Sequence, residues 1–343
     1  MLLSKRYKQN FKPHVKLNKT QKENINRFVD DLNKNKFKPS EKLSCLICKN
    51  YRFEVISEKD RYGLSYTTGI CGECGNLQQI EYYSDDALNH FYKSFYNKIY
   101  FNFIDPKKRF ESQFKLASDK FIFLCDYLKN INDKKKFRIL EIGCGPGGIL
   151  KYFKNKGFSV TGLDLDEEHL NYGKSQKLNL INKFSFKSDY KFDLIIISHV
   201  LEHMKNPEIE IDIIKNYAHK NTLFYIEVPS IHMIDNMYDS DFLKYLHIAH
   251  CYHFSLNSFK NFCIKNNLCI LKINKKIQAL CKVSMVSEEI KYHYNETIEE
   301  IQNIEKKYLK FGNFLILKRL IRRFVGRVLN KIGIKFYILN LFK

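Results

Sequence analysis

The sequence predicts an α/β protein with a doubly wound sheet, preceded by a small metal-binding module and followed by a C-terminal amphipathic helix. Three observations support this prediction. Apolar runs alternate with helical stretches between residues 137 and 275, which is the pattern of βαβ units around a parallel sheet. Two C-x-x-C pairs precede that region. A glycine-rich turn joins its first strand to its first helix.

Length and composition set the outer limits. The chain has 343 residues, of which 44% are hydrophobic, so a sizeable core is available and wholesale disorder is excluded. No apolar run approaches the roughly 20 residues that a membrane span needs, and the first residues lack the apolar stretch of a secretory signal. We therefore expect a cytoplasmic protein, whose ten cysteines are thiols or metal ligands rather than disulfides.

The net charge of +21 is concentrated in two tails. Residues 1–44 hold 12 Lys and Arg against 4 acids, residues 306–343 hold 11 and no acid, and the part between them is nearly neutral. Such tails suit nucleic acid, an anionic membrane surface or an acidic partner. For the N-terminal tail, biased overall composition is an equal alternative.

Composition divides the chain into consecutive regions. We expect a basic N-terminal arm, a zinc-binding module, a helical connector, the doubly wound domain and a helical, basic, amphipathic C-terminal region, at residues 1–44, 45–80, 81–135, 136–280 and 281–343, respectively. The strands expected in the fourth region are Phe137–Ile142, Ser159–Leu163, Asp193–Ser198, Thr222–Val228 and Leu268–Ile273.

The metal-binding module rests on Cys45, Cys48, Cys71 and Cys74. The short spacing lets both thiolates of a pair face one ion, and two such pairs complete a closed, four-sulfur site of the structural zinc type. A bound metal would supply folding energy that a module of this size lacks. The alternatives are redox cysteines and buried apolar thiols.

The glycine-rich turn predicts a nucleoside-containing cofactor. The strand ending at Ile142 runs into Gly143–Gly148, and a helix follows. Asp164 ends the next expected strand, 19 residues after Gly145, where an acid receives a ribose diol. Taken alone, this pattern also fits a nicotinamide cofactor, and Asp164 also suits the N-cap of the following helix. After the third strand, the segment Ser198–Met204 brings polar groups to the carboxyl edge of the sheet, where ligands bind.

These segments together resemble class I S-adenosylmethionine-dependent methyltransferases, whose domain is Rossmann-like. The resemblance rests on Leu140–Gly147, Asp164 and Val200–His203 and covers roughly residues 137–275. It implies that residues 136–280 form a class I methyltransferase domain, that the loop wraps the methionyl group and that Asp164 binds the ribose. The candidate cofactor-binding residues are Glu141, Gly143, Cys144, Gly145, Gly147, Asp164, Leu165, Asp189, Ser198 and His199, with Asp189 as the adenine-binding acid.

The N-terminal module narrows the resemblance. It is similar to the zinc module of sugar C-methyltransferases and surface-glycan methyltransferases. The aromatic stretch Leu88–Tyr96 and the segment His247–Leu256 are similar to other segments of the same proteins. The last segment supplies catalytic residues in that subset. It departs from the pattern at Ile248, Ala249 and His253, which weakens the case for C-methylation, so that O-methylation with one histidine base fits at least as well.

Two histidines are the catalytic candidates that this resemblance implies. His250 falls on the second histidine of the subset's segment and is the expected base, because histidine titrates near the working pH. His203 is the second candidate, as a base or a substrate-orienting group. The alternative for both is a structural histidine.

The C-terminal region predicts an interfacial helix. From Leu309 onward, apolar residues share one face and a row of basic residues spaced by four, from Arg319 to Lys335, forms another. This pattern resembles a helix that lies on anionic lipid, which would place the protein peripherally on the inner membrane face. A helix docked on the fold and a grip on RNA phosphates are the alternatives.

The function expected is therefore methyl transfer to a hydroxyl or carbon of a sugar nucleotide or lipid-linked glycan, in polysaccharide biosynthesis. The runner-up is a zinc-bearing ribosomal RNA methyltransferase. The nearly neutral central region and the absence of an Asn/Asp-Pro-Pro-Tyr/Phe motif favour the first reading. A binding or scaffold protein with an inactive methyltransferase fold is the third reading, and the intact Gly143–Gly147 loop argues against it.

Overall fold

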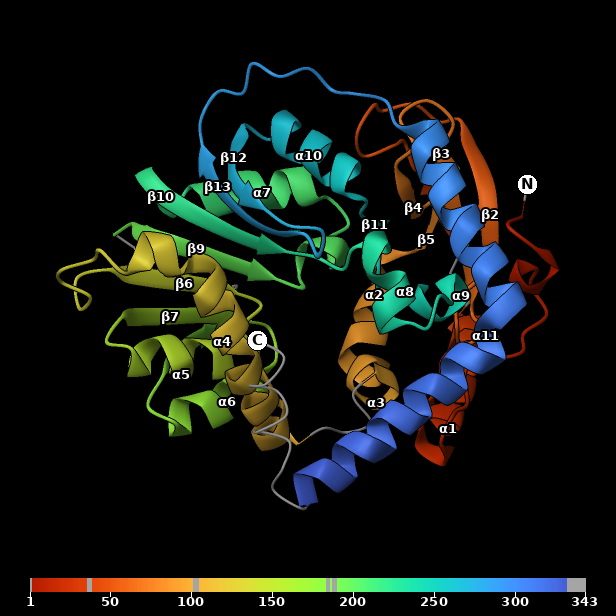
Figure 1. Ribbon diagram of the computed structural model, residues 1–343, viewed down its shortest axis with the longest axis horizontal. Helices are drawn as coiled ribbons and strands as arrows, with labels where there is room; N and C mark the ends of the chain where they lie inside the picture. Colours follow the sequence, from red (N-terminus) through yellow and green to blue (C-terminus); the bar gives the residue numbers. More distant parts are fainter. Residues whose placement is uncertain (1, 36–38, 101–104, 183–185, 187–189, 332–343) are drawn as a thin grey trace.

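The computed structural model describes the backbone of residues 2–35, 39–100, 105–182, 186 and 190–331. Within these ranges, the side chains of residues 35, 39–42, 313, 315–316, 318–320 and 322–331 are not described. The chain folds into two lobes, each with its own sheet, and Figure 1 shows the larger sheet in one lobe and the long C-terminal helix along the other.

The larger lobe has a seven-stranded sheet in the order β12-β13-β10-β9-β6-β7-β8. Its strands are β6 Arg138–Ile142, β7 Ser159–Asp164, β8 Asn179–Asn182, β9 Phe192–Ser198, β10 Ala218–Glu227, β12 Leu268–Ile273 and β13 Gln278–Val283. Strands β6 to β10 are parallel to one another, whereas β13 is antiparallel to β10 and to β12. The fold class predicted from the sequence is confirmed.

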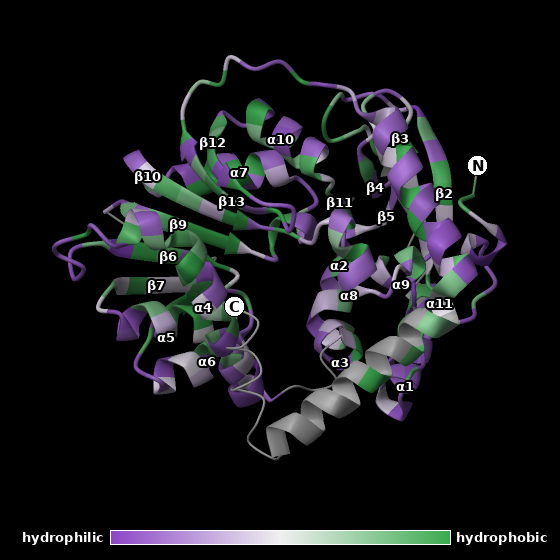
Figure 2. Cartoon of the chain, viewed as in Figure 1, coloured by the Kyte–Doolittle hydropathy of each residue, from purple (hydrophilic) through white to green (hydrophobic). Residues whose placement is uncertain are grey.

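Helices cover both faces of this sheet (Figure 1). They are α4 Pro106–Leu128, α5 Gly148–Asn155, α6 Glu167–Ser175, α7 Pro207–Lys215 and α10 Leu256–Lys265. Alternate residues of β9 show how the layers form. Leu194 and Ile196 pack in a cluster with α4, α5 and α6, while Ile195 and Ile197 pack in a cluster with α7 and α10. A strand buried on both faces is a continuous apolar run, as β9 is from Leu194 to Ile197 (Figure 2).

The smaller lobe is built on a four-stranded sheet in the order β11-β4-β3-β2. Its strands are β2 Phe53–Lys59, β3 Ser65–Cys71, β4 Leu77–Gln79 and β11 Tyr252–His253. The last strand comes from the other half of the sequence and pairs antiparallel with β4. The segment that carries His250 therefore enters the sheet that also carries the second cysteine pair. Sequence patterns did not predict β8, β11, β13 or this pairing.

Short helices complete the smaller lobe, with one long helix along its outer side (Figure 1). The remaining elements are η1 Lys5–Tyr7, α1 Lys19–Asn35, β1 Pro39–Lys42, β5 Glu81–Tyr83, α2 Asp85–Phe91, η2 Tyr92–Tyr96, α3 Asn97–Tyr100, η4 Leu201–His203, η5 Ile231–Met233, α8 Ile234–Met237, α9 Phe242–Tyr245 and α11 Tyr294–Lys331. None of the helices in the described part of the chain is long and apolar enough to cross a membrane.

The N-terminal arm packs on the fold. Arg6 forms an ion pair with the buried Glu305 of α11 and another, at 2.8 Å, with Asp241. Tyr7 is fully buried and donates its hydroxyl hydrogen to Glu305 at 2.8 Å. At least this part of the arm's positive charge is therefore used inside the molecule.

The C-terminal boundary also differs from the expected one. Strand β13 extends to Val283, so the large sheet continues three residues past residue 280. Residues 284–293 have no regular secondary structure, and α11 begins at Tyr294, fifteen residues before the expected helical pattern at Leu309. The first turns of α11 bury Ile301 and Ile304 in the core of the smaller lobe. Most side chains of the expected basic row lie outside the described residues.

Candidate active site

The glycine loop between β6 and α5 has the backbone that its sequence predicts. Gly143, Gly145 and Gly147 have φ angles of 68°, 54° and 81°, a region that residues with a Cβ rarely adopt. A Cβ at Gly143 would also lie 2.5 Å from Cγ2 of Val200. The loop can therefore bring its backbone close to a ligand only because these positions are glycine.

Gln113 of helix α4 is hydrogen-bonded to the backbone of this loop at two positions. The Gln113 amide donates to the Cys144 carbonyl at 3.1 Å and accepts from the Gly148 N–H at 3.0 Å. The packing is close, because a Cβ at Gly148 would lie 2.2 Å from the carbonyl oxygen of Phe110. Sequence reasoning missed Gln113, since a polar residue on a helix carries no sign of such a role.

Asp164 stands at the end of β7, next to the loop. Its carboxylate accepts hydrogen bonds from the N–H groups of Gly145, Leu165 and Asp166, at 2.6, 2.8 and 2.9 Å. The N-cap of α6 is Asp166, whose side chain accepts from the His169 N–H. The alternative role of Asp164 as that cap is therefore wrong, and its carboxylate is fixed beside the glycine loop.

The other predicted cofactor residues of this edge lie at different depths. Glu141 and Cys144 are buried, and burial raises the pKa of both, that of Glu141 to about 8. Among the residues that the structure describes, one Glu141 carboxylate oxygen, Oε2, has no hydrogen-bond partner. The Cys144 side chain is buried in the core, so this residue contributes only its backbone to the surface of the loop. Leu165 is exposed, and Asp189 lies outside the described residues.

Ser198 and His199 extend the site along the end of β9. The Ser198 hydroxyl donates to the Glu227 carboxylate at 3.0 Å, and the His199 N–H donates to the Glu227 carbonyl at 2.8 Å. The backbone of His199 is left-handed, with φ at 56°. A strained backbone of this kind often marks a functional site.

Glu227, at the end of β10, organises that part of the edge. It forms a buried ion pair with Lys120 of α4 and accepts from the Tyr225 hydroxyl at 3.0 Å. Burial raises its pKa, but Lys120 and His199 outweigh burial and hold the pKa below its usual value. Sequence reasoning missed Glu227, although a single acid at the end of an apolar strand was visible.

The two predicted catalytic histidines meet, although 46 residues separate them. The ring centroids of His203, in η4, and His250, before β11, lie 4.8 Å apart. The ring centroids of His247 and His250 lie 3.5 Å apart with the ring planes tilted by 49°, and the centroid of His253 lies 6.1 Å from that of His250. Burial and the neighbouring histidines lower the pKa of His250 well below its usual value, and the pKa of His203 is also lowered, mainly by burial. Both imidazoles are therefore neutral at pH 7, which differs from the expectation of a base that titrates near the working pH.

The four cysteines of the expected metal site come together in the smaller lobe. The sulfurs of Cys45 and Cys74 lie 3.4 Å apart, as do those of Cys48 and Cys71, and all four lie within 4.8 Å of one another. These residues belong to the same hydrophobic cluster as α7 and α10 of the larger lobe. The cysteine module is thus packed against the larger lobe rather than held apart from it.

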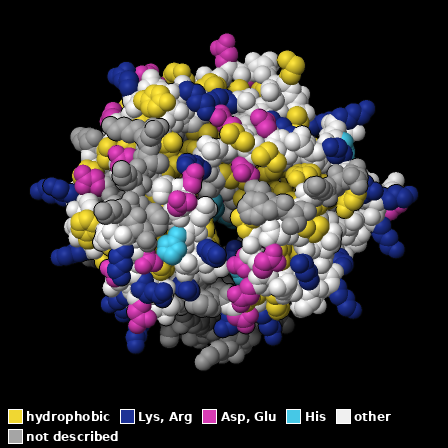
Figure 3. Space-filling view, turned by 180° about the vertical axis from the view of Figure 1, so that it is seen from behind, with side chains coloured by type: hydrophobic (Ala, Val, Ile, Leu, Met, Phe, Trp, Pro, Cys, Tyr) yellow, Lys and Arg dark blue, Asp and Glu magenta, His cyan; other side chains and the backbone are white. Residues whose placement is uncertain are grey.

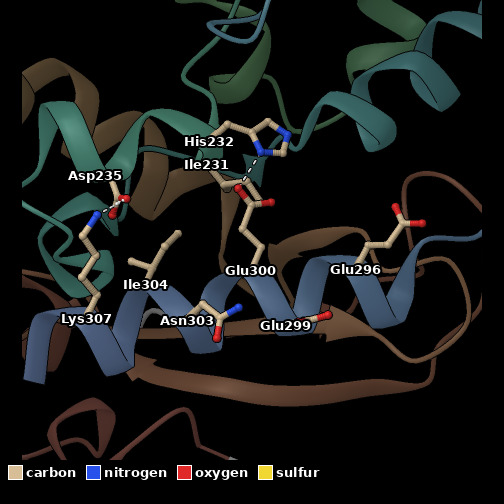
Figure 4. A pocket seen from close by; sticks show the side chains of 9 residues that line it. All are labelled: Ile231, His232, Asp235, Glu296, Glu299, Glu300, Asn303, Ile304 and Lys307. Carbon is tan, nitrogen blue, oxygen red and sulfur yellow. Dashed lines mark hydrogen bonds and ion pairs between the residues drawn. The ribbon is translucent and has the colours of Figure 1, made fainter.

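A separate surface groove of about 450 Å³ lies between α11 and the η5–α8 segment (Figure 4). Its polar lining is largely paired, because His232 binds Glu300 and Lys307 binds Asp235. It contains none of the predicted cofactor or catalytic residues.

Comparison with known proteins identifies the larger lobe. Residues 110–273 match the model of a methyltransferase domain family. A probable (S)-tetrahydroprotoberberine N-methyltransferase 2 of Papaver bracteatum is 31% identical over 112 residues, which are 29% of this chain and 31% of that protein. A ubiquinone biosynthesis O-methyltransferase of Glaesserella parasuis is 28% identical over 136 residues, which are 36% of this chain and 56% of that protein.

Solved structures include the plantazolicin methyltransferase BpumL in complex with SAH, at 18% identity and a TM-score of 0.40, with 65% of this chain and 89% of that chain covered. The chain spans about a third of the length of the poppy relatives and somewhat more than half of the Glaesserella parasuis protein. The family model spans residues 110–273, so the cysteine pairs and α11 lie outside the matched range.

Proposed function

Residues 110–273 form an S-adenosylmethionine-dependent methyltransferase domain, and from this premise we propose that the protein methylates a hydroxyl group of a sugar or surface-glycan intermediate. One observation supports the binding of the cofactor: Asp164, at the end of the strand next to β6, is hydrogen-bonded to the glycine loop. The choice of acceptor rests on the similarity of the cysteine module and the histidine segment to glycan-modifying methyltransferases.

The residues of the loop fit the cofactor. The left-handed glycines keep the loop free of side chains that would block a ligand, and the N-terminus of α5 favours the negative charge of a methionyl carboxylate. Asp164 would accept from the two ribose hydroxyls. Oε2 of Glu141, which has no hydrogen-bond partner among the described residues, belongs to the strand that leads into the loop. When bound, S-adenosylmethionine supplies a methyl group on a positively charged sulfur, which is an activated electrophile.

The protein contributes to the reaction mainly by positioning the substrate hydroxyl relative to the cofactor. A hydroxyl held in line with the methyl group and the sulfur reacts faster because the encounter is already arranged. The histidines of the smaller lobe stand at the edge where β9 ends, since Val200 touches the glycine loop and His203 follows it closely. The side chain of His203 donates from Nδ1 to the Ala249 carbonyl at 2.7 Å, so the lone pair of the neutral ring is on Nε2.

The four-cysteine cluster fits a structural zinc ion. Four thiolates at about 2.3 Å from one Zn²⁺ stand about 3.8 Å apart in a tetrahedron, close to the 3.4 Å observed for two of the pairs. The ion would be held by Cys45, Cys48, Cys71 and Cys74 and would fix the loops that pack on α7 and α10. We assign it a folding role, because no ligand position is open to substrate.

We also propose that α11 attaches the protein to an anionic membrane surface. Its outer half exposes Phe314, Leu317 and Ile321, which are spaced by three and four and share one helix face. The sequence from residue 306 onward adds 11 positive charges without an acid. Co-sedimentation with vesicles containing phosphatidylglycerol, but not with phosphatidylcholine vesicles, is the expected result. Equal recovery with both would contradict this role.

Transfer of label tests the acceptor. The purified protein is incubated with methyl-labelled S-adenosylmethionine and a cell extract that lacks it, and RNA is separated from nucleotide-sugar and glycan-lipid material. We expect label in the sugar or glycan pool, insensitive to ribonuclease and lost with Asp164→Ala but kept with the exposed Asp212→Asn. Label in RNA would overturn the glycan proposal. On the face shown in Figure 3, Lys and Arg side chains are interspersed with Asp and Glu side chains, a mixture of charge that does not favour RNA binding there.

A further inference from the structure

Glu202 is a buried acid surrounded by histidines. It lies in η4 shortly after β9, and its side chain is 1% exposed. In the described part of the chain, neither carboxylate oxygen has a hydrogen-bond partner, and its ion pairs are with histidines alone. A buried carboxylate without hydrogen bonds is unfavourable, so this residue needs an explanation.

Three histidines surround one oxygen of this carboxylate. Oε1 of Glu202 lies 3.5 Å from Nδ1 of His199, 3.7 Å from Nε2 of His203 and 3.9 Å from Nε2 of His250. These separations are too long for good hydrogen bonds. Two ligand atoms on opposite sides of an ion, each about 2.1 Å from it, are about 4.2 Å apart, and the three observed distances are shorter than this. A small cation between the groups can therefore reach both members of each pair.

The hydrogen bond of His203 decides which atom faces the carboxylate. The Ala249 carbonyl can only accept, so Nδ1 of His203 carries the hydrogen and donates to it at 2.7 Å. In the neutral ring, Nε2 then presents a lone pair toward Glu202. Two acceptors that face each other without a hydrogen between them repel, unless a cation stands between them. The bond to Ala249 also orients the ring, as partners of metal-bound histidines commonly do.

We propose that Glu202, His203 and His250 bind a divalent first-row transition-metal ion. Their ligand atoms all lie within 4.8 Å of one another, which a shift of a few tenths of an ångström brings to a common ion. Two imidazoles and a carboxylate suit Zn²⁺, Fe²⁺ or Mn²⁺ rather than Ca²⁺, which takes six to eight oxygens. The segments that carry the ligands are tied together, because the Cys251 N–H donates to the Glu202 carbonyl at 2.8 Å.

Three protein ligands leave further coordination positions open, which is typical of catalytic rather than structural sites. The site lies beside the cofactor loop, since Val200, which contacts Gly143, is two residues from Glu202. His199 stands on the solvent side, with half of its side chain exposed. A substrate hydroxyl that reaches the ion from this side would stand close to the methyl group.

The role of the ion rests on the proposed function, although its binding does not. A hydroxyl oxygen bound to the ion loses its proton to solvent water more readily, because the positive charge stabilises the alkoxide. The oxygen then forms a bond to the methyl carbon while the carbon–sulfur bond breaks, and that electron pair stays on sulfur as a neutral thioether. With this arrangement, His250 acts as a metal ligand, and a neutral imidazole is what the ion requires.

Cobalt binding tests the site. The full-length protein is treated with a chelator, brought to one Zn²⁺ per chain to fill the thiolate site, and titrated with Co²⁺. We expect one equivalent of Co²⁺ to bind with weak d–d absorption and without the sulfur-to-metal charge-transfer bands of a thiolate site. Glu202→Gln should weaken Co²⁺ binding at least tenfold, whereas the matched control His232→Gln, whose histidine pairs with Glu300, should leave it unchanged.

Failure of the site and failure of the proposed function can be separated. S-adenosylmethionine affinity is measured by calorimetry on the same samples, which also shows that each variant is folded. If the wild type takes up no Co²⁺ beyond the thiolate site, or if Glu202→Gln binds it as the wild type does, the metal proposal is overturned whatever the cofactor does. If Glu202→Gln does not fold, His203→Gln replaces it with the same expectation.

Discussion

Replacing Gly148 with alanine is a demanding test of how α4 supports the cofactor loop. The added Cβ would lie 2.2 Å from the Phe110 carbonyl oxygen, 2.7 Å from Cβ of Gln113 and 2.9 Å from the Phe114 nitrogen. Real Cβ atoms essentially never approach closer than 3.0 Å, so α4 must move away by about 1 Å. Two of the three obstacles are backbone atoms, which cannot rotate aside as the end of a side chain can.

Two effects contribute to the loss of stability in Gly148→Ala. Overpacking of this kind costs about 1–3 kcal/mol. Moving α4 also breaks the hydrogen bonds of Gln113 to Cys144 and Gly148, each worth about 1 kcal/mol. We expect a total loss of about 3–5 kcal/mol in the free energy of unfolding, which corresponds to a fall of about 6–20 °C in the unfolding temperature. Because the loop shifts with α5, affinity for S-adenosylmethionine should also fall at least tenfold.

Thermal unfolding and calorimetric titration with S-adenosylmethionine measure both effects. The matched control is Gly72→Ala, in the cysteine module, where the added Cβ meets only the Arg52 carbonyl oxygen at an ordinary 3.7 Å. If Gly148→Ala unfolds at the same temperature as this control and binds the cofactor as the wild type does, the close packing of α4 on the loop is refuted.

Three further changes test other parts of the molecule. Gln113→Leu keeps the volume but removes both loop contacts, so KM for S-adenosylmethionine should rise about tenfold in steady-state assays, with kcat nearly constant. Cys71→Ser should reduce the zinc content measured by mass spectrometry by one equivalent and unfold the smaller lobe, while Cys125→Ser, outside the cluster, should do neither. Glu305→Gln should cost about 2–3 kcal/mol near pH 7, because Arg6 loses a buried charged partner. Burial alone would raise the pKa of Glu305, but Arg6 and two hydroxyls hold that pKa below its usual value. The difference between wild type and variant in the free energy of unfolding, measured with urea, should therefore stay constant from pH 6 to 8 and shrink as the pH falls below about 4.

The elements that the sequence predicted well are those with a local cause. The apolar run of β9 is buried on both faces, so its composition alone marks a central strand. Gly143, Gly145 and Gly147 need left-handed backbone, and glycine supplies it cheaply. Asp164 follows from chain order, because the carboxyl ends of adjacent parallel strands meet at one edge.

The elements that the sequence did not predict depend on contacts between distant segments. Strand β11 has two residues and pairs with a strand more than 170 positions earlier in the chain. The ion pair of Arg6 with Glu305 joins opposite ends of the described chain, so a charge count alone treated Arg6 as part of a free basic arm. The meeting of Glu202 with His250 depends on the packing of the two lobes, and no spacing in the sequence shows it.

The position of the cofactor is the central claim, and one calorimetric experiment tests it directly. S-adenosylmethionine is titrated into the full-length wild type and into Asp164→Ala, with Asp212→Asn as the exposed control. We predict a single binding site in the wild type and the control, and an affinity at least tenfold weaker in Asp164→Ala, because the ribose loses a charged acceptor. Absence of binding to the wild type, or equal affinity in all three proteins, would contradict the account.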